Sequence, residues 1–207
     1  MTGQLEDIGA RLREERERHG ISQRELARRL GVSASLISQV ESGQSRPSVS
    51  TLYAIVTELG ASLDHVFRGH SHDGQAGTGE SWSAVSGPQE VAVKTTPLVH
   101  PEERHVIELA SGVRWERLTT DEENVDFLHV VYDVGGSSSA NSTLMRHAGR
   151  EYGYVVSGRL GVKLGFEQYE LGPGDTIAFD STLPHRLWNL GDEPVHGIWF
   201  VVGRGGQ

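Results

Sequence analysis

The sequence predicts an α + β protein of two domains: five N-terminal helices, then a C-terminal β-barrel of the jelly-roll type. Apolar residues in the first 68 positions recur every three or four residues, as in amphipathic helices. Beyond about residue 90, short strand-like segments alternate with Gly-containing turns, as in jelly rolls and related barrels. Residues 69–89 are rich in Gly and Ser and follow neither period, which indicates a flexible linker. The expected domains are therefore residues 1–68 and 90–207.

Each expected helix of the first domain has a start or stop signal. Ser22, followed three residues later by Glu25, forms a capping-box pattern ahead of an apolar stripe. Glycine ends helices because it adopts a left-handed backbone without strain, and it follows four of the five stripes. The expected N-caps are Ser22, Ser33, Ser48 and Ser62, and the expected terminators are Gly20, Gly31, Gly43 and Gly60.

Ten segments of the C-terminal half have the length and pattern of strands. They begin near residues 106, 113, 127, 142, 152, 160, 169, 176, 185 and 196. Turn signals such as Gly135-Gly136 and Gly172-Pro173-Gly174 separate them. Many short strands at close spacing favour a barrel in which alternate side chains point inward.

Composition and charge exclude several classes of protein. The 207 residues include no cysteine, which rules out disulfides and thiolate metal sites. We find no secretory signal and no apolar stretch long enough to span a membrane, so we expect a cytoplasmic protein without a membrane partner. The net charge of −9 argues against nucleic acid as a partner. However, the first 70 residues balance nine arginines against nine acidic residues, which permits a local basic face.

The segment from residue 8 to about residue 68 resembles the phage-repressor-like helix-turn-helix, often called the XRE type. The residues that carry the resemblance are Gln23, Ala27, Gly31, Ile37, Glu41, Gly43, Pro47 and Leu52. The resemblance implies a domain that places the helix after Ser33 in the major groove of double-stranded DNA. A small helical bundle that contacts another protein is the alternative.

The helix after Ser33 has a small, polar outward face that suits a groove about 12 Å wide. Ala34, Ser35, Ser38 and Gln39 form this face. Gln39 can make a bidentate contact with adenine, and the two serines can hydrogen-bond base edges. The resemblance implies phosphate contacts from Gln23, Ser42, Gln44 and Arg46. A domain of this size covers a modest footprint, so we expect a homodimer on a two-fold operator.

Residues 145–158, MRHAGREYGYVVSG, place a histidine, a carboxylate and a glycine at fixed spacing. His147 is followed after three residues by Glu151 and after six more by Gly158. A second segment further along the chain contributes Gly174, His185 and Asn189. With these two motifs, the C-terminal half resembles a cupin over roughly residues 125–202.

The cupin resemblance implies a metal site inside the barrel. Positions 145, 147, 151, 185, 187 and 189 can project to one face of their strands. His147, Glu151 and His185 are the expected ligands, because two imidazoles and one carboxylate suit Fe(II) and also accept Zn, Mn or Ni. Met145 stands in place of a further histidine, and its thioether is a poor ligand for such ions. Three protein ligands and an open position are therefore expected; the alternative is a cupin that has lost its metal.

Several side chains on neighbouring strands are candidates for contact with a small organic effector. They are Trp115, Arg117, Tyr132, Met145 and Asn189. The alternative is that the aromatic members are simply core residues of the β domain.

The two resemblances together predict a one-component transcription regulator, in which an effector in the cupin pocket shifts the population of DNA-binding arrangements. An enzyme is the alternative, because His147, Glu151 and His185 also resemble the iron site of 2-hydroxypropylphosphonic acid epoxidase. That enzyme likewise joins an XRE-type domain to a cupin. The polar, groove-compatible face of the third helix favours the regulator.

Overall fold

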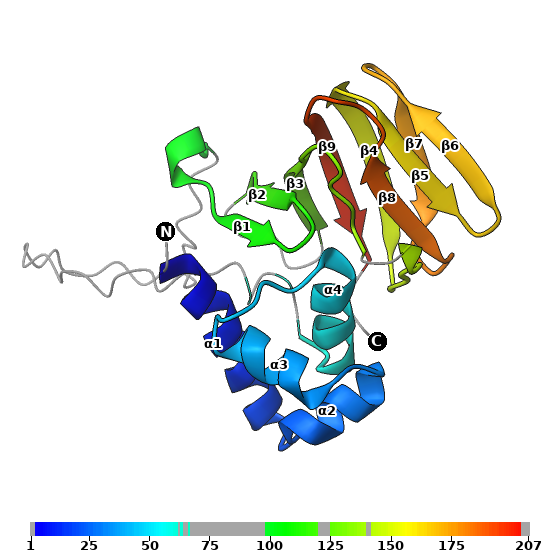
Figure 1. Ribbon diagram of the computed structural model, residues 1–207. Helices are drawn as coiled ribbons and strands as arrows, with labels where there is room; N and C mark the ends of the chain where they lie inside the picture. The colour runs from blue at the N-terminus through cyan, green and yellow to red at the C-terminus, as the bar shows by residue number, and fades with distance from the viewer. Residues whose placement is uncertain are drawn as a thin grey trace, which may run out of the picture.

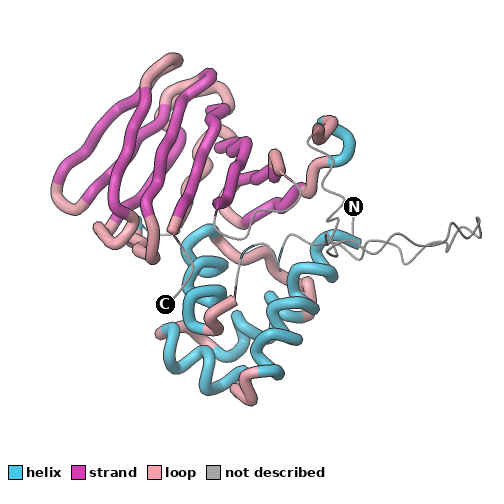
Figure 2. Tube along the Cα trace, turned by 180° about the vertical axis from the view of Figure 1, so that it is seen from behind, coloured by secondary structure: helices cyan, strands magenta, loops and turns pink. Residues whose placement is uncertain are grey.

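The computed structural model describes residues 3–61, 63, 66, 98–119, 125–139 and 142–203, without the side chains of residues 3–7. Figure 1 shows helices gathered below two β-sheets, and Figure 2 shows the same two layers from behind. The expected linker at residues 69–89 lies outside the described residues. The arrangement confirms an α + β protein with a helical N-terminal part and a β C-terminal part.

The described helical part contains α1 (Gly3–Arg18), α2 (Gln23–Leu30), α3 (Ala34–Glu41) and α4 (Val49–Glu58). Ser22, Ser33 and Ser48 each accept a hydrogen bond from the backbone N–H three residues later, as N-caps do. Gly31 ends α2 with a φ of 67°, a left-handed conformation that glycine adopts without strain. Among the described residues, no helix is both long and apolar enough to cross a membrane.

One expectation for the helical domain is wrong, and another lies mostly outside the described residues. Four helices have described bounds rather than the expected five, and of the expected last helix only Leu63 and Val66 are described. Both of these residues are helical and buried. The capping box is not formed as expected, because the Glu25 carboxylate makes charge-assisted bonds to Arg28 and Arg29.

α1 and α3 pack closely at Gly9. A Cβ at this position would lie 2.3 Å from the carbonyl oxygen of Val40, so the contact requires glycine. Beside it, the buried Arg16 guanidinium binds the Glu41 carboxylate through Nε (2.6 Å) and Nη2 (2.9 Å). Gln23 Nε2 donates to the same carboxylate at 2.8 Å. This buried cluster joins α1, α2 and α3 and fixes the direction in which α3 points.

The described C-terminal part begins with a short 3₁₀ turn, η1 (Pro101–Glu103), and contains nine strands. They are β1 (Val106–Leu109), β2 (Val113–Arg117), β3 (Val125–Tyr132), β4 (Arg150–Ser157), β5 (Leu160–Leu164), β6 (Glu167–Leu171), β7 (Thr176–Asp180), β8 (His185–Asn189) and β9 (Val195–Val202). Antiparallel pairing gives one sheet in the order β1-β2-β3-β9-β4-β7 and another in the order β6-β5-β8. Alternate residues of β2, β4, β8 and β9 are buried, as in a two-sheet sandwich.

The closed barrel and the strand expected near residue 142 are both wrong for the described residues. Only isolated bridges, Met145 to His185 and Ser137 to Trp188, pair with β8 on the side away from β5. Ser142 has a φ of 60°, which interrupts an extended backbone. This edge of β8 is therefore paired only through single residues. A continuous strand along it would help to close a barrel.

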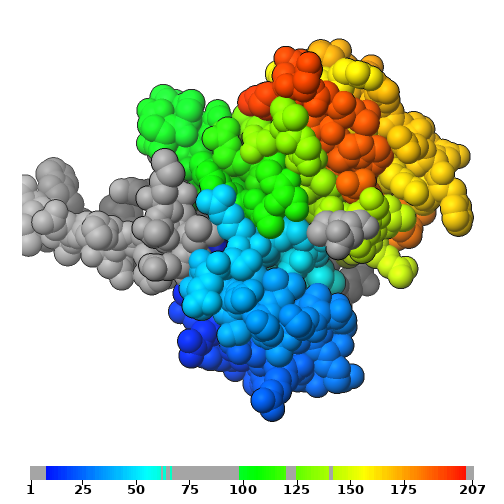
Figure 3. Space-filling view, in the orientation of Figure 1, coloured from blue at the N-terminus to red at the C-terminus, as the bar shows by residue number. Residues whose placement is uncertain are grey.

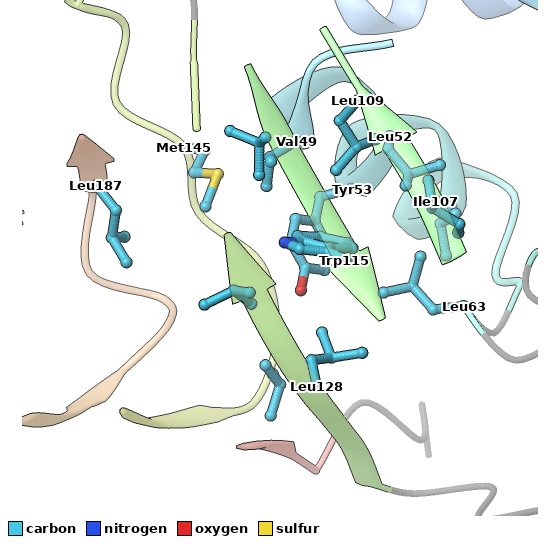
Figure 4. Packing of buried hydrophobic residues seen from close by; sticks show 14 of the residues in the cluster. Val49, Leu52, Tyr53, Leu63, Ile107, Leu109, Trp115, Leu128, Met145 and Leu187 are labelled. Atoms are coloured by element: carbon cyan, nitrogen blue, oxygen red, sulfur yellow. The ribbon is translucent and has the colours of Figure 1, made fainter. Parts of the chain in front are cut away.

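One apolar cluster of buried residues runs through both parts of the molecule. Figure 4 shows Leu52 and Tyr53 of α4 beside Ile107, Leu109 and Trp115 of β1 and β2. Figure 3 shows the cyan helical surface meeting the green surface of the first strands. The helical domain and the sheets therefore share a packed, largely apolar interface.

Candidate DNA-binding surface and metal centre

The polar face predicted for α3 lies at the surface. Ile37 and Val40 are buried against the other helices, which leaves Ser35, Ser38 and Gln39 exposed. Ala34 is half-buried, and Ser33, the exposed N-cap, accepts from the Leu36 N–H. The exposed side chains are short or flexible and polar, as a helix that enters a groove requires.

The expected phosphate contacts have different surroundings. Ser42 and Gln44 are exposed after the end of α3. Gln23 is half-buried, and its amide is held by Glu41. Arg46 is exposed, but its guanidinium forms an ion pair with Glu108 of β1, with 2.6 Å between Nη2 and Oε2. Arg46 would therefore have to exchange this partner for a phosphate.

His147, Glu151 and His185 converge between the two sheets of the β domain. Their ligand atoms all lie within 4.8 Å of one another, and all three residues are buried. Glu151 Oε1 is 2.9 Å from His147 Nε2 and 3.2 Å from His185 Nε2. Among the described residues, none of these three atoms has a hydrogen-bond partner of good geometry. Three buried ligand atoms that face one point fit a cation between them.

Backbone carbonyls orient both imidazoles. His147 Nδ1 lies 3.0 Å from the oxygen of Ala148, and His185 Nδ1 lies 2.8 Å from the oxygen of Leu183. A carbonyl can only accept, so each Nδ1 carries the proton and each Nε2 is left with a lone pair in the neutral ring. Such outer contacts are typical of metal-binding histidines.

Trp199 of β9 holds the carboxylate of the site. Its indole Nε1 donates to Glu151 Oε2 at 2.8 Å. The indole lies over Gly153 of β4, where a Cβ would come within 2.1 Å of the ring. The missing side chain of Gly153 therefore makes room for the group that orients Glu151.

Without a bound cation, the Glu151 carboxylate and the protonated imidazoles of the site stabilise one another. Burial alone would raise the pKa of the Glu151 carboxyl, but His147 and His185 outweigh burial and hold this pKa below its usual range. Burial alone would lower the pKa of His185, whereas the Glu151 carboxylate raises it above the ordinary histidine value. Glu151 thus stays ionised inside the protein, where a bound cation would compensate its charge.

A small cavity of about 20 Å³ lies beside the Glu151 carboxylate. Of the expected effector contacts, Trp115, Tyr132 and Met145 line it. Arg117 and Asn189 are buried but are not among the lining residues. The Asn189 amide instead donates to the carbonyl oxygens of residues 132, 133 and 193, which is a structural role.

Sequence reasoning missed two kinds of residue at this cavity. Val49 and Tyr53 line it although they belong to α4 of the helical domain. Trp199 was not assigned a role, because nothing in the local pattern of β9 connects it to Glu151. The sequence indicates that α4 has a buried apolar stripe. It does not indicate that part of this stripe faces the other domain.

Two family models match the chain: a helix-turn-helix model over residues 12–66 and a cupin domain model over residues 128–201. The HTH-type transcriptional regulator PuuR of Escherichia coli (strain K12) is 26% identical over 182 residues, which cover 87% of this chain and 86% of PuuR. The crystal structure of an HTH_3 family transcriptional regulator from Vibrio cholerae matches with a TM-score of 0.63 at 20% identity, covering 96% of each chain. The structural match supports the two-domain fold.

A shorter relative decides the family. An uncharacterized transcriptional regulator in the ATPase CF(0) region of Rhodospirillum rubrum is 36% identical over 90 residues, which cover 41% of this chain and 83% of that protein. The chain belongs to the helix-turn-helix transcriptional regulators. This regulator has an XRE-type DNA-binding domain followed by a cupin domain.

Proposed function

We propose that the regulator acts in the cytoplasm as a homodimer on two-fold operator DNA, and that its cupin domain binds a divalent metal and a small organic effector. The DNA-binding domain would comprise residues 1–68 and the sensor domain residues 90–207, with residues 69–89 as the linker. The observation that carries the proposal is the exposed polar face of α3 on a helix-turn-helix domain. A dimer would present two copies of α3 to successive turns of the major groove.

The proposed residue roles follow from exposure and chemistry. Gln39, Ser35 and Ser38 project side chains that can reach base edges. Ser42, Gln44 and Arg46 follow the end of α3 and would bind phosphates. Ser33, Ala34 and Gln23 would set the position of the helix on the duplex.

His147, Glu151 and His185 would hold the metal, and their buried, convergent ligand atoms fit one. A metal bound by three protein groups offers its remaining coordination positions to a donor atom of an effector. Burial and the Glu151 charge both raise the pKa of Tyr132, so its hydroxyl stays protonated beside the site as a neutral donor. Trp115 and Met145 add apolar walls.

The test is selection of genomic DNA fragments by the purified full-length protein at physiological salt, with and without a chelator. Recovery of a discrete sequence is the expected result. Binding that shows no sequence preference and is lost as salt rises would contradict the proposal. Elemental analysis of the same preparation is expected to find a divalent metal in the wild type and none in the His147→Ala variant.

An iron-dependent oxygenase is the second candidate, because two histidines and one carboxylate also form the usual site of such enzymes. The fragment selection separates the two functions. An oxygenase has no need for a preferred sequence, whereas a regulator does.

A further inference from the structure

The DNA-binding domain supplies part of the wall of the cupin cavity. The Tyr53 ring stacks on the His147 ring, with 4.1 Å between centroids and 15° between planes. It also meets the Trp115 ring at 5.5 Å and 59°. Tyr53 is only 4% exposed, and Val49, one helical turn earlier, lines the same cavity. A residue of α4 therefore lies directly against a proposed metal ligand (Figure 4 shows it beside Trp115).

Polar contacts between the two domains lie near the start of α4. The Ser50 N–H donates to the Ser138 oxygen at 3.0 Å. The Ala110 N–H donates to the Pro47 oxygen at 2.9 Å. The ion pair between Arg46 and Glu108 is exposed, and such pairs contribute about 0–1 kcal/mol. Because these contacts are individually weak, the buried apolar side chains of α4 supply most of the docking energy.

With Tyr53 in place, the cavity beside Glu151 is too small for an organic molecule. About 20 Å³ holds roughly one water, whereas sites for organic ligands measure about 300–1,000 Å³. The largest side chain that the helical domain contributes to the cavity lining is the Tyr53 phenol. Removal of this side chain would open a ring-sized space that reaches His147 and the ligand atoms of the site.

We propose that the effector of the cupin domain binds in the space held by the Tyr53 ring, so that effector binding and the docking of α4 exclude each other. The effector would be a small, flat, mostly apolar molecule, because it takes a space that faces the His147 and Trp115 rings and has apolar walls. One nitrogen or oxygen donor of that molecule would point to the metal-binding triad. The inference rests on the proposed sensor role of the cupin domain.

The test uses p-cresol, which is the tyrosine side chain as a free molecule, and the full-length chain. Calorimetry measures its affinity for the wild type, Tyr53→Ala, Tyr53→Leu and the control Tyr154→Ala. Tyr53→Leu keeps a strong helix former at the position, so it serves if the alanine variant does not fold. Tyr154 is 45% exposed on β4, so its truncation removes the same phenol ring away from the cavity.

Both Tyr53 variants are expected to bind p-cresol at least tenfold more tightly than the wild type and Tyr154→Ala do. Saturating p-cresol is expected to enlarge the radius of gyration of the wild type in small-angle X-ray scattering, because α4 leaves the cupin domain. Equal affinity for a folded Tyr53 variant and the wild type, or an unchanged radius of the saturated wild type, overturns the proposal.

Selection of DNA by the wild type is measured on the same preparation. Failure to select a sequence counts against the regulator, whereas failure of p-cresol to distinguish the variants counts only against the shared site.

Discussion

The candidate DNA-binding surface and the candidate metal centre are built in opposite ways. The exposed face of α3 comes from a few consecutive residues between two turns, and the serine cap and the buried residues of one helix define it. The candidate metal centre joins side chains from β4, β8 and the loop before β4. Its outer contacts come from Trp199 of β9 and from the backbone carbonyls of Ala148 and Leu183. Local signals therefore define the first site, whereas the pairing of distant strands defines the second. A substitution should accordingly disturb one site while the other survives.

The largest expected effect tests whether α3 depends on contacts outside its own sequence. Glu41→Ala leaves the Arg16 guanidinium buried without its carboxylate, which is expected to destabilise the helical domain by about 3–5 kcal/mol. Thermal unfolding followed at the helical circular dichroism signal should show the loss, while metal binding by the cupin domain persists. Glu25→Ala is the control, because it removes exposed ion pairs of α2 and should leave the transition nearly unchanged. Equal behaviour of the two variants would contradict the anchoring role of Glu41.

The next effect tests the metal centre alone. His185→Ala removes one of three ligands and is expected to weaken binding of Zn²⁺ or Fe²⁺ by more than about a hundredfold, since even outer contacts are worth 10–100-fold. Metal binding is measured by competition with a chromophoric chelator. His129→Ala is the matched control, because His129 is a half-buried histidine bonded to Glu116 and His196, outside the triad. Metal binding by His185→Ala at the wild-type affinity would contradict the assignment of His185 as a metal ligand.

A smaller effect tests the outer contact that sequence reasoning missed. Trp199→Phe keeps the aromatic packing but removes the N–H that orients Glu151, so metal affinity is expected to fall about 10–100-fold. The same chelator competition measures it. Trp188→Phe is the control, because the Trp188 indole packs over Gly161 of the other sheet. If both variants bind metal equally well, Trp199 only fills space.

The smallest expected effect concerns an ion pair between the helical domain and the β domain. Glu108→Gln removes the charge that holds Arg46, which leaves the guanidinium available for a phosphate. DNA affinity is expected to rise by up to about fivefold, because an exposed ion pair contributes at most about 1 kcal/mol. Fluorescence anisotropy with a selected duplex measures the change. Glu170→Gln breaks another exposed ion pair, with Arg159, and should leave DNA affinity unchanged. A loss of affinity in Glu108→Gln would contradict the competition between Glu108 and DNA.

Much of the helical site could be predicted because its determinants are local. The sequence predicts that α3 begins after Ser33 and ends after Glu41, and the helix has the same limits in the structure. In the cupin half, the resemblance to the cupin motifs pointed to the triad that the structure brings together, although His147 lies in the loop before β4 rather than in a strand. The closed barrel could not be judged from sequence, because edge pairing depends on features such as the left-handed backbone of Ser142.

The contacts that cross between the domains could not be predicted at all. Tyr53 occupies a position that is apolar in any packed helix, and nothing within α4 distinguishes burial against its own domain from burial against His147. The same holds for Arg46, whose exposure and charge suit a phosphate as well as Glu108. In both contacts the two residues lie 60 or more positions apart, and the way the two domains pack together decides which residues meet. No local sequence pattern in this chain indicates that packing.

The central claim is that α3 reads base sequence, and the specificity ratio tests it most directly. The affinity of the wild type for its selected duplex is compared with that for a scrambled duplex of equal length at physiological salt. The account predicts a ratio of about 10³ or more, together with a relaxed preference at one base pair for Gln39→Ala. A ratio near one for the folded, metal-loaded protein would contradict it.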